Sequence, residues 1–222
     1  MKIVVIEDHQ LVRDMLVESC GHVLPGAEAR GASTGAEGVR VCCEFGPGLV
    51  FLDLALPDGD GLDFIADIFA ASPGAKVVAL TSHTDEFTLY RALRAQVHGF
   101  VDKNEQPLKV LGEVIASVMD GGRYFSPSAQ RLRLAMRNNP VDFSKLLSDR
   151  EQELLAWFGA GLTDEEIGGR LDLAARTVKK HRLRIMGKLG VHSTPQLMRY
   201  ALEKGFTRVQ GAPHPVARAS GS

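Results

Sequence analysis

The chain has 222 residues, of which 45 % are hydrophobic and 24 % charged, a composition that excludes a disordered chain and suffices for two domains with separate cores. Its net charge of −1 hides an asymmetry: residues 1–120 carry 9 Lys and Arg against 18 Asp and Glu (9 − 18 = −9), and residues 121–222 carry 17 against 9 (17 − 9 = +8). An acidic half followed by a basic half predicts two domains with different partners, the basic one suited to a polyanion.

The cysteines and the amino terminus bear on the cellular compartment. Cys20, Cys42 and Cys43 are odd in number and lack the spacing of metal ligands, which is typical of free thiols in a reducing compartment. The first apolar run stops at two carboxylates, as a buried strand does and a signal peptide does not. The sequence contains no run of about 18 apolar residues that could span a membrane. We therefore expect a cytoplasmic protein.

Short apolar runs alternate with amphipathic stretches over residues 1–120. The third and fourth runs are apolar on both faces, as in a parallel sheet that helices cover on each side. Five such repeats predict an α/β fold with a doubly wound, five-stranded parallel sheet of the flavodoxin type, whose chemistry lies at the carboxyl ends of the strands. The predicted strands are 2–6, 28–32, 49–52, 76–80 and 99–101, and the predicted helices are 10–20, 35–45, 62–71, 85–96 and 107–120.

The rest of the chain reads as helical. Residues 121–143 are predicted to form a linker that is partly helical, residues 144–206 a small all-α domain, and residues 207–222, rich in Gly, Pro, Ala and Ser, a disordered tail. A short helix, a tight turn and a longer helix in the all-α domain form a helix-turn-helix. Its predicted helices are 149–159, 164–171, 175–189 and 195–204.

Polar side chains follow four of the predicted strands. Glu7 and Asp8 come after the first strand and Asp53 after the third, so the sheet brings three carboxylates together. A hard cation such as Mg²⁺ relieves the repulsion among them. Each acid alone could simply cap a helix. Together, however, the acids predict a phosphoryl-transfer site, because they would supply a carboxylate nucleophile and hold a metal beside hydroxyl groups and a lysine. The later strands contribute Thr81, Ser82 and Lys103.

The predicted helix 175–189 carries six cations and no acid. Val178, Ile185 and Leu189 share one side, where they can pack. The other side is basic and suits the major groove of DNA, whereas a lone basic helix is more often a solvated surface. The cations of the helix are Arg176, Lys179, Lys180, Arg182, Arg184 and Lys188, and the face opposite the packed side holds Arg176, Lys179, Lys180, Leu183 and Arg184.

Four motifs give the first 120 residues a resemblance to a known family. IEDHQLVR, VFLDLALPDGDGLDF, ALTSH and GFVDK together resemble the receiver domain of two-component response regulators. The resemblance implies that Asp53 accepts a phosphoryl group. It also implies that Asp8, Asp53 and the backbone carbonyl of Ala55 ligate Mg²⁺, with Glu7 acting through water.

The same resemblance assigns roles at the later strand ends. It implies that Thr81 and Phe100 move together on phosphorylation and that Lys103 contacts the phosphoryl group. A calcium loop is not expected in DGDG, because Leu56 stands at its first ligand position. A phosphatase of the haloacid dehalogenase type would need a second acid where this chain has Ala55.

Residues 146–193 resemble the LuxR-type output domain, so the whole chain resembles a response regulator of the NarL/FixJ type. The resemblance implies a sensor histidine kinase, a homodimer when phosphorylated or DNA-bound, and double-stranded DNA as partners, with the helix 195–204 pairing the domains. Lys179, Lys180 and Leu183 would face bases, and Thr177 and Lys188 would contact phosphates. The protein would then be a regulator and not an enzyme.

Two departures from the family pattern weaken the output domain. Gly168 and Gly169 occupy a short helix, and each lowers the stability of that helix by about 0.5–1 kcal/mol relative to Ala. Ala174 stands where the family usually has a serine N-cap, and the missing cap lowers stability by about 1 kcal/mol. We expect this domain to be the less stable half, and Gly168→Ala to stabilise it by about 0.4–1 kcal/mol. A regulator that acts chiefly through protein contacts, and an aspartate-nucleophile phosphohydrolase, remain as alternatives.

Overall fold

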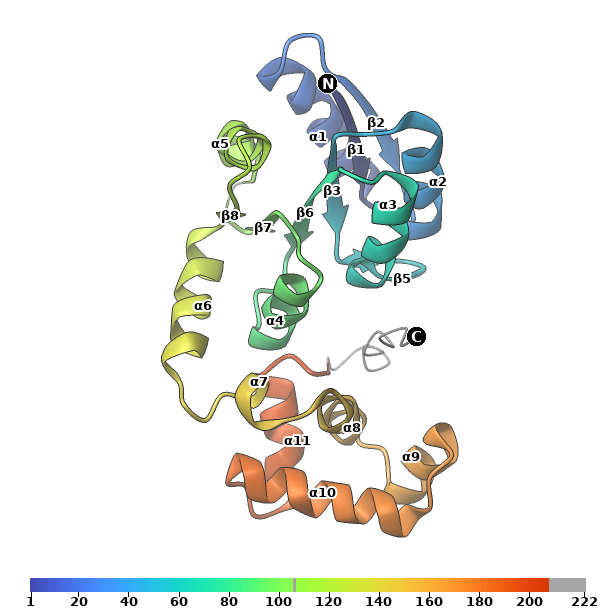
Figure 1. Cartoon of the computed structure of the whole chain (residues 1–222), viewed down its shortest axis with the longest axis vertical. Coiled ribbons are helices and arrows are strands. Elements are labelled where there is room, and N and C mark those ends of the chain that lie inside the picture. The colour runs from blue at the N-terminus through green and yellow to red at the C-terminus, as the bar shows by residue number, and fades with distance from the viewer. Residues whose placement is uncertain (106, 208–222) are drawn as a thin grey trace. The chain divides into compact units, whose positions relative to one another are not determined.

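The computed structural model describes residues 1–105 and 107–207 (Figure 1). Of the tail predicted at 207–222, all but the first residue lies outside the described residues. Within the described part of the chain, no helix combines the length and the apolar character that a membrane span requires.

Contacts between residues divide the chain into two compact units. The first unit comprises residues 1–84 and 89–131, and the second comprises residues 85–88 and the chain from residue 132 onward. Each unit has its own set of buried apolar side chains.

The first unit is built around a parallel sheet with helices on both faces. Its strands lie in the order β2-β1-β3-β6-β7-β8, and every neighbouring pair is parallel. This confirms the doubly wound α/β class. The strands are β1 (Lys2–Ile6), β2 (Glu28–Ala32), β3 (Leu49–Asp53), β6 (Lys76–Thr81), β7 (Gly99–Asp102) and β8 (Tyr124–Phe125).

The strand β8 is a sixth strand where the sequence predicts five. It comes from the segment predicted as a linker, and it pairs with the outer edge of β7. The Tyr124 N–H donates to the His98 carbonyl at 3.1 Å, and the Ser126 N–H donates to the Phe100 carbonyl at 2.9 Å. A strand of two residues is too short to show the alternation by which strands are predicted.

Two pairs of helices cover the sheet. The helices α1 and α5 share a buried core with one face, which includes Leu16, Phe51 and Val114. Figure 1 shows α2 and α3 side by side at the opposite face. The helices of this part of the chain are α1 (Gln10–Val23), α2 (Gly35–Phe45), α3 (Ile65–Ala71), α4 (Glu86–Arg94) and α5 (Pro107–Met119).

The second unit is helical, as the sequence predicts. The S-x-x-E and T-x-x-E sequences at Ser148 and Thr163 form capping boxes with Glu151 and Glu166, and Ala174 caps its helix without a side-chain hydrogen bond. The helices after β8 are α6 (Pro127–Asn138), α7 (Phe143–Leu146), α8 (Asp149–Gly159), α9 (Asp164–Leu171), α10 (Ala175–Leu189) and α11 (Thr194–Glu203).

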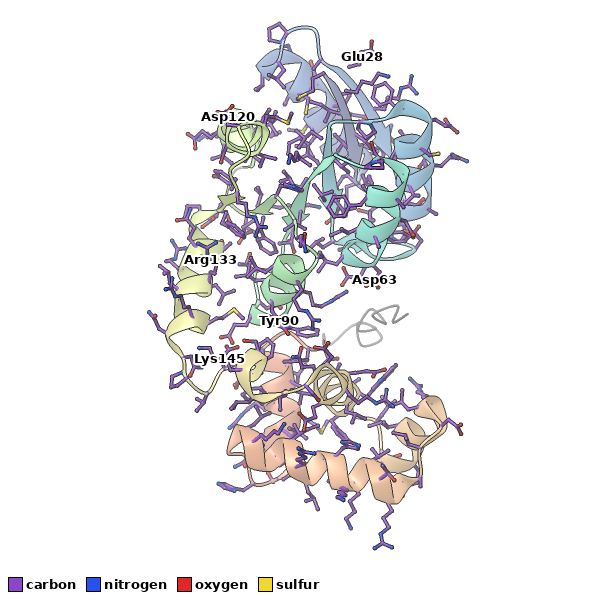
Figure 2. All side chains as sticks on the ribbon, in the orientation of Figure 1. Glu28, Asp63, Tyr90, Asp120, Arg133 and Lys145 are labelled. Atoms are coloured by element: carbon purple, nitrogen blue, oxygen red, sulfur yellow. The ribbon has the colours of Figure 1, made fainter. Side chains whose placement is uncertain are left out.

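A lysine of α7 caps the carboxyl end of α6. The Nζ atom of Lys145, labelled in Figure 2, donates to three backbone carbonyls at the end of α6, those of Met136, Arg137 and Asn139, at 2.6–3.2 Å. A cation at the carboxyl end of a helix satisfies carbonyls that have no partner within the helix.

The environment of Gly168 contradicts the expectation that alanine would stabilise this position. A Cβ atom at Gly168 would lie 2.5 Å from the backbone oxygen of Leu173, whereas one at Gly169 would meet nothing within 4 Å. The turn that follows α9 folds back on Gly168, whose carbonyl accepts from the Leu173 N–H at 2.9 Å. Gly168 therefore allows the close approach of the turn. Of the two, only Gly169 is a glycine that packing does not require, so only there should alanine be tolerated.

Candidate functional site

The predicted carboxylates meet at the carboxyl ends of β1 and β3. Glu7 is fully buried and Asp53 is 2 % exposed. The Nζ atom of Lys103, which follows β7, lies 2.7 Å from Glu7 Oε2 and 2.8 Å from Asp53 Oδ2. Three strands thus bring two buried acids and one cation to a single point.

Burial disfavours the charged form of Glu7. It raises the pKa of Glu7 above its usual value, and the nearby Asp53 carboxylate adds to that effect. The hydrogen bond from Lys103 acts in the opposite direction without cancelling it. When both acids are ionised, they carry one more negative charge than Lys103 neutralises, which makes the site receptive to a further cation.

Asp8 and His9 extend the cluster toward solvent. The Asp8 side chain is 31 % exposed and its Oδ1 lies 2.8 Å from His9 Nδ1. One ligand atom each from Glu7, Asp8 and His9 lie within 4.8 Å of one another. A donor set of three carboxylates, with the Ala55 carbonyl on the loop after β3, fits a hard cation such as Mg²⁺. His9 is a neighbour of this site that the sequence prediction does not include.

The loop after β3 is held by close packing. The Ala55 N–H donates to Asp53 Oδ1 at 3.2 Å. Gly61 begins the 3₁₀-helix η1 (Gly61–Phe64), and a Cβ atom there would lie 2.1 Å from the Asp53 carbonyl oxygen. Glycine is therefore required for the loop to return against β3.

Two further contacts anchor that loop. The Asp58 carboxylate accepts from the N–H groups of Gly35 and Ala36 at 2.9 Å and so caps α2. The guanidinium of Arg91 on α4 donates to Asp63 on η1, labelled in Figure 2, at 2.7 Å. The loop after β3 is thereby tied to α2 and α4.

The other predicted residues of this site lie on β6, β7 and the loop after β6. The Thr81 hydroxyl, which is buried, donates to the His83 carbonyl at 3.1 Å and accepts from its N–H at 3.0 Å. Ser82 is exposed beside it, and Phe100 is fully buried in the sheet. The structure thus places Thr81 and Ser82 at the strand end and Phe100 in the core behind it.

A cavity of about 830 Å³ opens beside Asp53. Its polar wall includes Lys103, and its apolar wall comes from α1 and α5, with Val12, Met15 and Leu108. Next to it, Leu11 is 74 % exposed. A phosphate group could reach Asp53 from this side, and an apolar surface borders the entrance.

The helix α10 divides into a packed and an exposed side, as predicted. Val178 and Ile185 are fully buried. The exposed side carries side chains that make no ion pair with any residue the structure describes, apart from Arg184, whose Nε lies 3.5 Å from Glu151 Oε1. The exposed residues of the predicted set are Arg176, Thr177, Lys179, Lys180, Leu183 and Arg184.

Two cations of α10 bind carboxylates of neighbouring helices within the second unit. Arg182 donates to both carboxylate oxygens of Asp164 at 3.1 and 2.7 Å and to the Thr194 hydroxyl at 2.6 Å. Lys188 donates to Glu151 Oε2 at 2.6 Å. Glu151 is 4 % exposed; burial alone would raise its pKa, but the hydrogen bonds from Lys188 and Ser148 leave the pKa below its usual value. Sequence reasoning did not predict that this acid binds Lys188, because no periodic spacing relates Glu151 to α10.

Comparisons with known proteins follow the same division of the chain. Residues 3–115 match the model of the response regulator receiver domain, and residues 145–201 match that of the bacterial regulatory proteins of the luxR family. The chain is 32 % identical over 216 residues to the oxygen regulatory protein NreC of Staphylococcus aureus, covering 92 % of this chain and 98 % of that protein.

Solved structures support the fold. A complex of the two-component response regulator RcsB with DNA has a TM-score of 0.62 at 23 % identity, covering 90 % of this chain and 96 % of that one. RcsB from Salmonella enterica serovar Typhimurium, bound to a promoter with a phosphomimetic, has a TM-score of 0.63 at 22 % identity over 90 % and 97 %.

The fold and the two sites define a class, that of regulators in which a receiver domain controls an attached DNA-binding domain. The chain belongs to the two-component response regulators of the NarL/FixJ type, which join a receiver domain to a LuxR-type domain. Proteins of this class are typically regulators and not enzymes.

Proposed function

We propose that Asp53 accepts a phosphoryl group from a sensor histidine kinase, and that the phosphorylated chain dimerises and binds paired sites on double-stranded DNA. The observation that carries the proposal is the contact of Lys103 Nζ with the buried Asp53 carboxylate, 2.8 Å away, at the floor of an open cavity. Because the proposed target is DNA, we expect the protein to act in the cytoplasm.

The chemistry is a transfer of one phosphoryl group. A carboxylate oxygen of Asp53 attacks phosphorus, the P–O or P–N bond to the donor breaks, and the donor leaves with the electron pair. Lys103 neutralises the charge that collects on the phosphoryl oxygens. Glu7, Asp8, Asp53 and the Ala55 carbonyl would hold Mg²⁺, which supplies charge neutralisation and orientation when it is bound.

The environment of Asp53 supports a phosphoacceptor more than a hydrolase, because Ala55 stands where an aspartate-nucleophile phosphohydrolase would place its second acid. Beyond the acids that would hold the metal, the described side chains of the cavity that could act as a base are those of His9 and His83. A phosphoacceptor should retain about one phosphoryl group per chain. Release of many equivalents of phosphate would indicate the phosphohydrolase instead.

Three cationic side chains support a nucleic-acid partner. Arg176, Lys179 and Lys180 lie exposed on the second helix of the helix-turn-helix without ion pairs in the described chain. Such a surface suits phosphates and base edges in the major groove. The alternative of a regulator without strong DNA binding rested on the pair of glycines in α9. Gly168 is explained by the close packing of the Leu173 carbonyl against it, so it no longer supports that alternative.

The acceptor assignment is tested by labelling the full chain with radiolabelled acetyl phosphate and Mg²⁺. Asp53→Asn should take up no label. The matched control is Asp67→Asn, an exposed acid in the first turn of α3, and it should take up label as the wild type does. Full labelling of Asp53→Asn would remove the assignment. An electrophoretic shift of genomic fragments, with and without acetyl phosphate, tests the DNA partner in the same preparations.

A further inference from the structure

A second acid at the end of β7 has a full set of partners that the proposed function does not use. Asp102 is 7 % exposed. Its Oδ1 accepts from the N–H and the Nδ2 of Asn104 at 2.8 and 2.9 Å, and its Oδ2 accepts from the hydroxyls of Thr84 and Ser128 at 2.7 and 3.2 Å. Its own N–H donates to the Ser126 hydroxyl at 3.3 Å. The carboxylate therefore binds four donors from outside its own residue.

The partners of Asp102 come from three different segments. Thr84 lies on the loop after β6, three residues beyond Thr81. Asn104 adjoins Lys103, and its Nδ2 lies 3.0 Å from the Ser82 carbonyl. Ser128 lies in the first turn of α6, directly after β8. One carboxylate thus joins the two loops at the phosphoacceptor site to the start of the linker helix.

The position of Asp102 determines that of Lys103. The Lys103 N–H donates to the Thr81 carbonyl at 2.7 Å, and the residues on either side of Lys103 are bound to each other through the Asp102 carboxylate. The Nζ of the same lysine reaches Glu7 and Asp53. A displacement of Asp102 would therefore move the cation of the acceptor site.

The Ser128 hydroxyl stands between two acids. It lies 3.2 Å from Asp102 Oδ2 and 3.1 Å from Glu105 Oε2, and the Ser128 N–H also donates to Glu105 at 3.2 Å. A hydroxyl has a single hydrogen to donate, so it can satisfy one of the two carboxylates at a time. The first turn of α6 can thus exchange partners with a small movement.

We propose that Asp102 is a positioning residue for the phosphoacceptor site, which joins Lys103 and the loop after Thr81 to Ser128, so that α6 responds to phosphorylation of Asp53. This proposal rests on the proposed function. A phosphoryl group on Asp53 brings oxygens that attract Lys103 Nζ and the Thr81 hydroxyl. When Thr81 releases His83, the loop that ends at Thr84 shifts, and Ser128 transfers its hydrogen bond from Asp102 to Glu105.

The experiment uses the full chain and two measurements. The first is the rate of labelling by radiolabelled acetyl phosphate, and the second is the amide hydrogen exchange of residues 124–130 with and without that donor. The variants are Asp102→Ala, Asp102→Asn and Ser128→Ala. The matched control is Ser72→Ala, because Ser72 is a buried serine whose hydroxyl donates to the Pro47 carbonyl at 3.0 Å, away from β7.

The wild type should become labelled, and the amide hydrogen exchange of residues 124–130 should change on phosphorylation. Asp102→Ala should label about tenfold more slowly, because it frees the segment that carries Lys103. Asp102→Asn should recover most of that rate, since the hydroxyls of Thr84 and Ser128 can accept from an amide as well as donate. Ser128→Ala should label at the wild-type rate but lose the exchange response, and Ser72→Ala should behave as the wild type.

The outcomes separate the two proposals. If the wild type takes up no label, or if Asp53→Asn takes up as much, the proposed function is wrong. If the wild type labels but Asp102→Ala labels equally fast, or if Ser128→Ala keeps the exchange response, the role of Asp102 is wrong. Absence of any exchange response in a labelled wild type also overturns it. Should Asp102→Ala fail to fold, Ser128→Ala and Asp102→Asn decide the question.

Discussion

The cations of α10 differ in what they contact, and this difference predicts different roles. Lys179 is exposed without an ion pair in the described chain, whereas Lys188 binds the buried Glu151 at 2.6 Å. A free lysine on the exposed side can approach base edges. Lys188 lies at the helix end with its side chain 30 % exposed, so it can meet a phosphate by leaving Glu151 and is not placed to read bases.

Lys179→Ala should therefore reduce sequence discrimination by about 1–3 kcal/mol. Lys188→Ala should weaken binding evenly across sequences and lower the slope of log affinity against log salt by about one. The measurement is competition binding of the full chain to a set of related DNA sites at several salt concentrations. Equal changes of specificity in both variants would contradict this orientation of α10.

The three thiols should differ in reactivity. Burial raises the pKa of Cys20 and Cys42 to about 11, because the charged thiolate is disfavoured away from water, whereas Cys43 is exposed. At pH 8 the native chain should incorporate about one equivalent of iodoacetamide, at Cys43, and Cys43→Ser should incorporate almost none. Peptide mapping identifies the site. Rapid labelling of Cys20 at that pH would show that the core between α1 and α5 opens.

Much of the acceptor site could be predicted from residues at strand ends. Asp53, Glu7 and Lys103 could be placed together because parallel strands expose their carboxyl ends at one edge of a sheet. Asp102 could not be predicted in the same way. Its partners Thr84 and Ser128 are 18 and 26 residues away, and no periodic pattern relates them to it.

At the scale of elements, long periodic segments were predictable and short ones were not. The strands β1, β3 and β6 are nearly continuous apolar runs, and the helices α8 to α11 follow apolar periodicity. Capping boxes mark the start of α8 and α9. The strand β8, the hairpin of β4 (Ala55–Leu56) with β5 (Gly59–Asp60), and α7 have between two and four residues each. Tertiary contacts form such elements, and their own sequences carry little signal.

The helix α9 provides a matched pair of substitutions. Gly168→Ala should destabilise the second unit by about 1–3 kcal/mol, because a Cβ atom there collides with the Leu173 carbonyl. Gly169→Ala has open space and should stabilise the unit by about 0.4–1 kcal/mol. Trp157 lies on α8 and is the only tryptophan of the chain, so its fluorescence during thermal unfolding reports on this unit.

Opposite shifts of the fluorescence midpoint for the two variants are the expected result. A stabilised Gly168→Ala would restore the simpler view in which both glycines merely weaken α9. The comparison also bears on function, because α9 supports the turn that precedes α10.

At the scale of the whole molecule, the apolar border of the cavity suits a protein phosphodonor. Leu11 is 74 % exposed at the start of α1, close to the entrance but not among the residues that line it. Leu11→Asp should reduce phosphoryl transfer from the cognate kinase, because a charge would be buried in the contact between the proteins.

The same variant should take up label from acetyl phosphate at the wild-type rate. The measurement is a parallel time course with the kinase that labels the wild type fastest and with acetyl phosphate. Loss of labelling from both donors would place Leu11 in the acceptor site itself. Unchanged transfer from both would mean that the kinase docks elsewhere.

The pairing of β8 with β7 also bears on how such a chain can be divided. An unpaired strand at the edge of a sheet is a template for association with another chain. A fragment that stops at residue 120 would leave the N–H and C=O groups of β7 without β8, whereas one that continues to residue 131 would keep them covered. The shorter fragment should self-associate more strongly in sedimentation experiments. Recombination can exchange receivers and output domains between proteins. A receiver inherited in this way must then extend past β7 and include β8, a segment that a sequence comparison would count as linker.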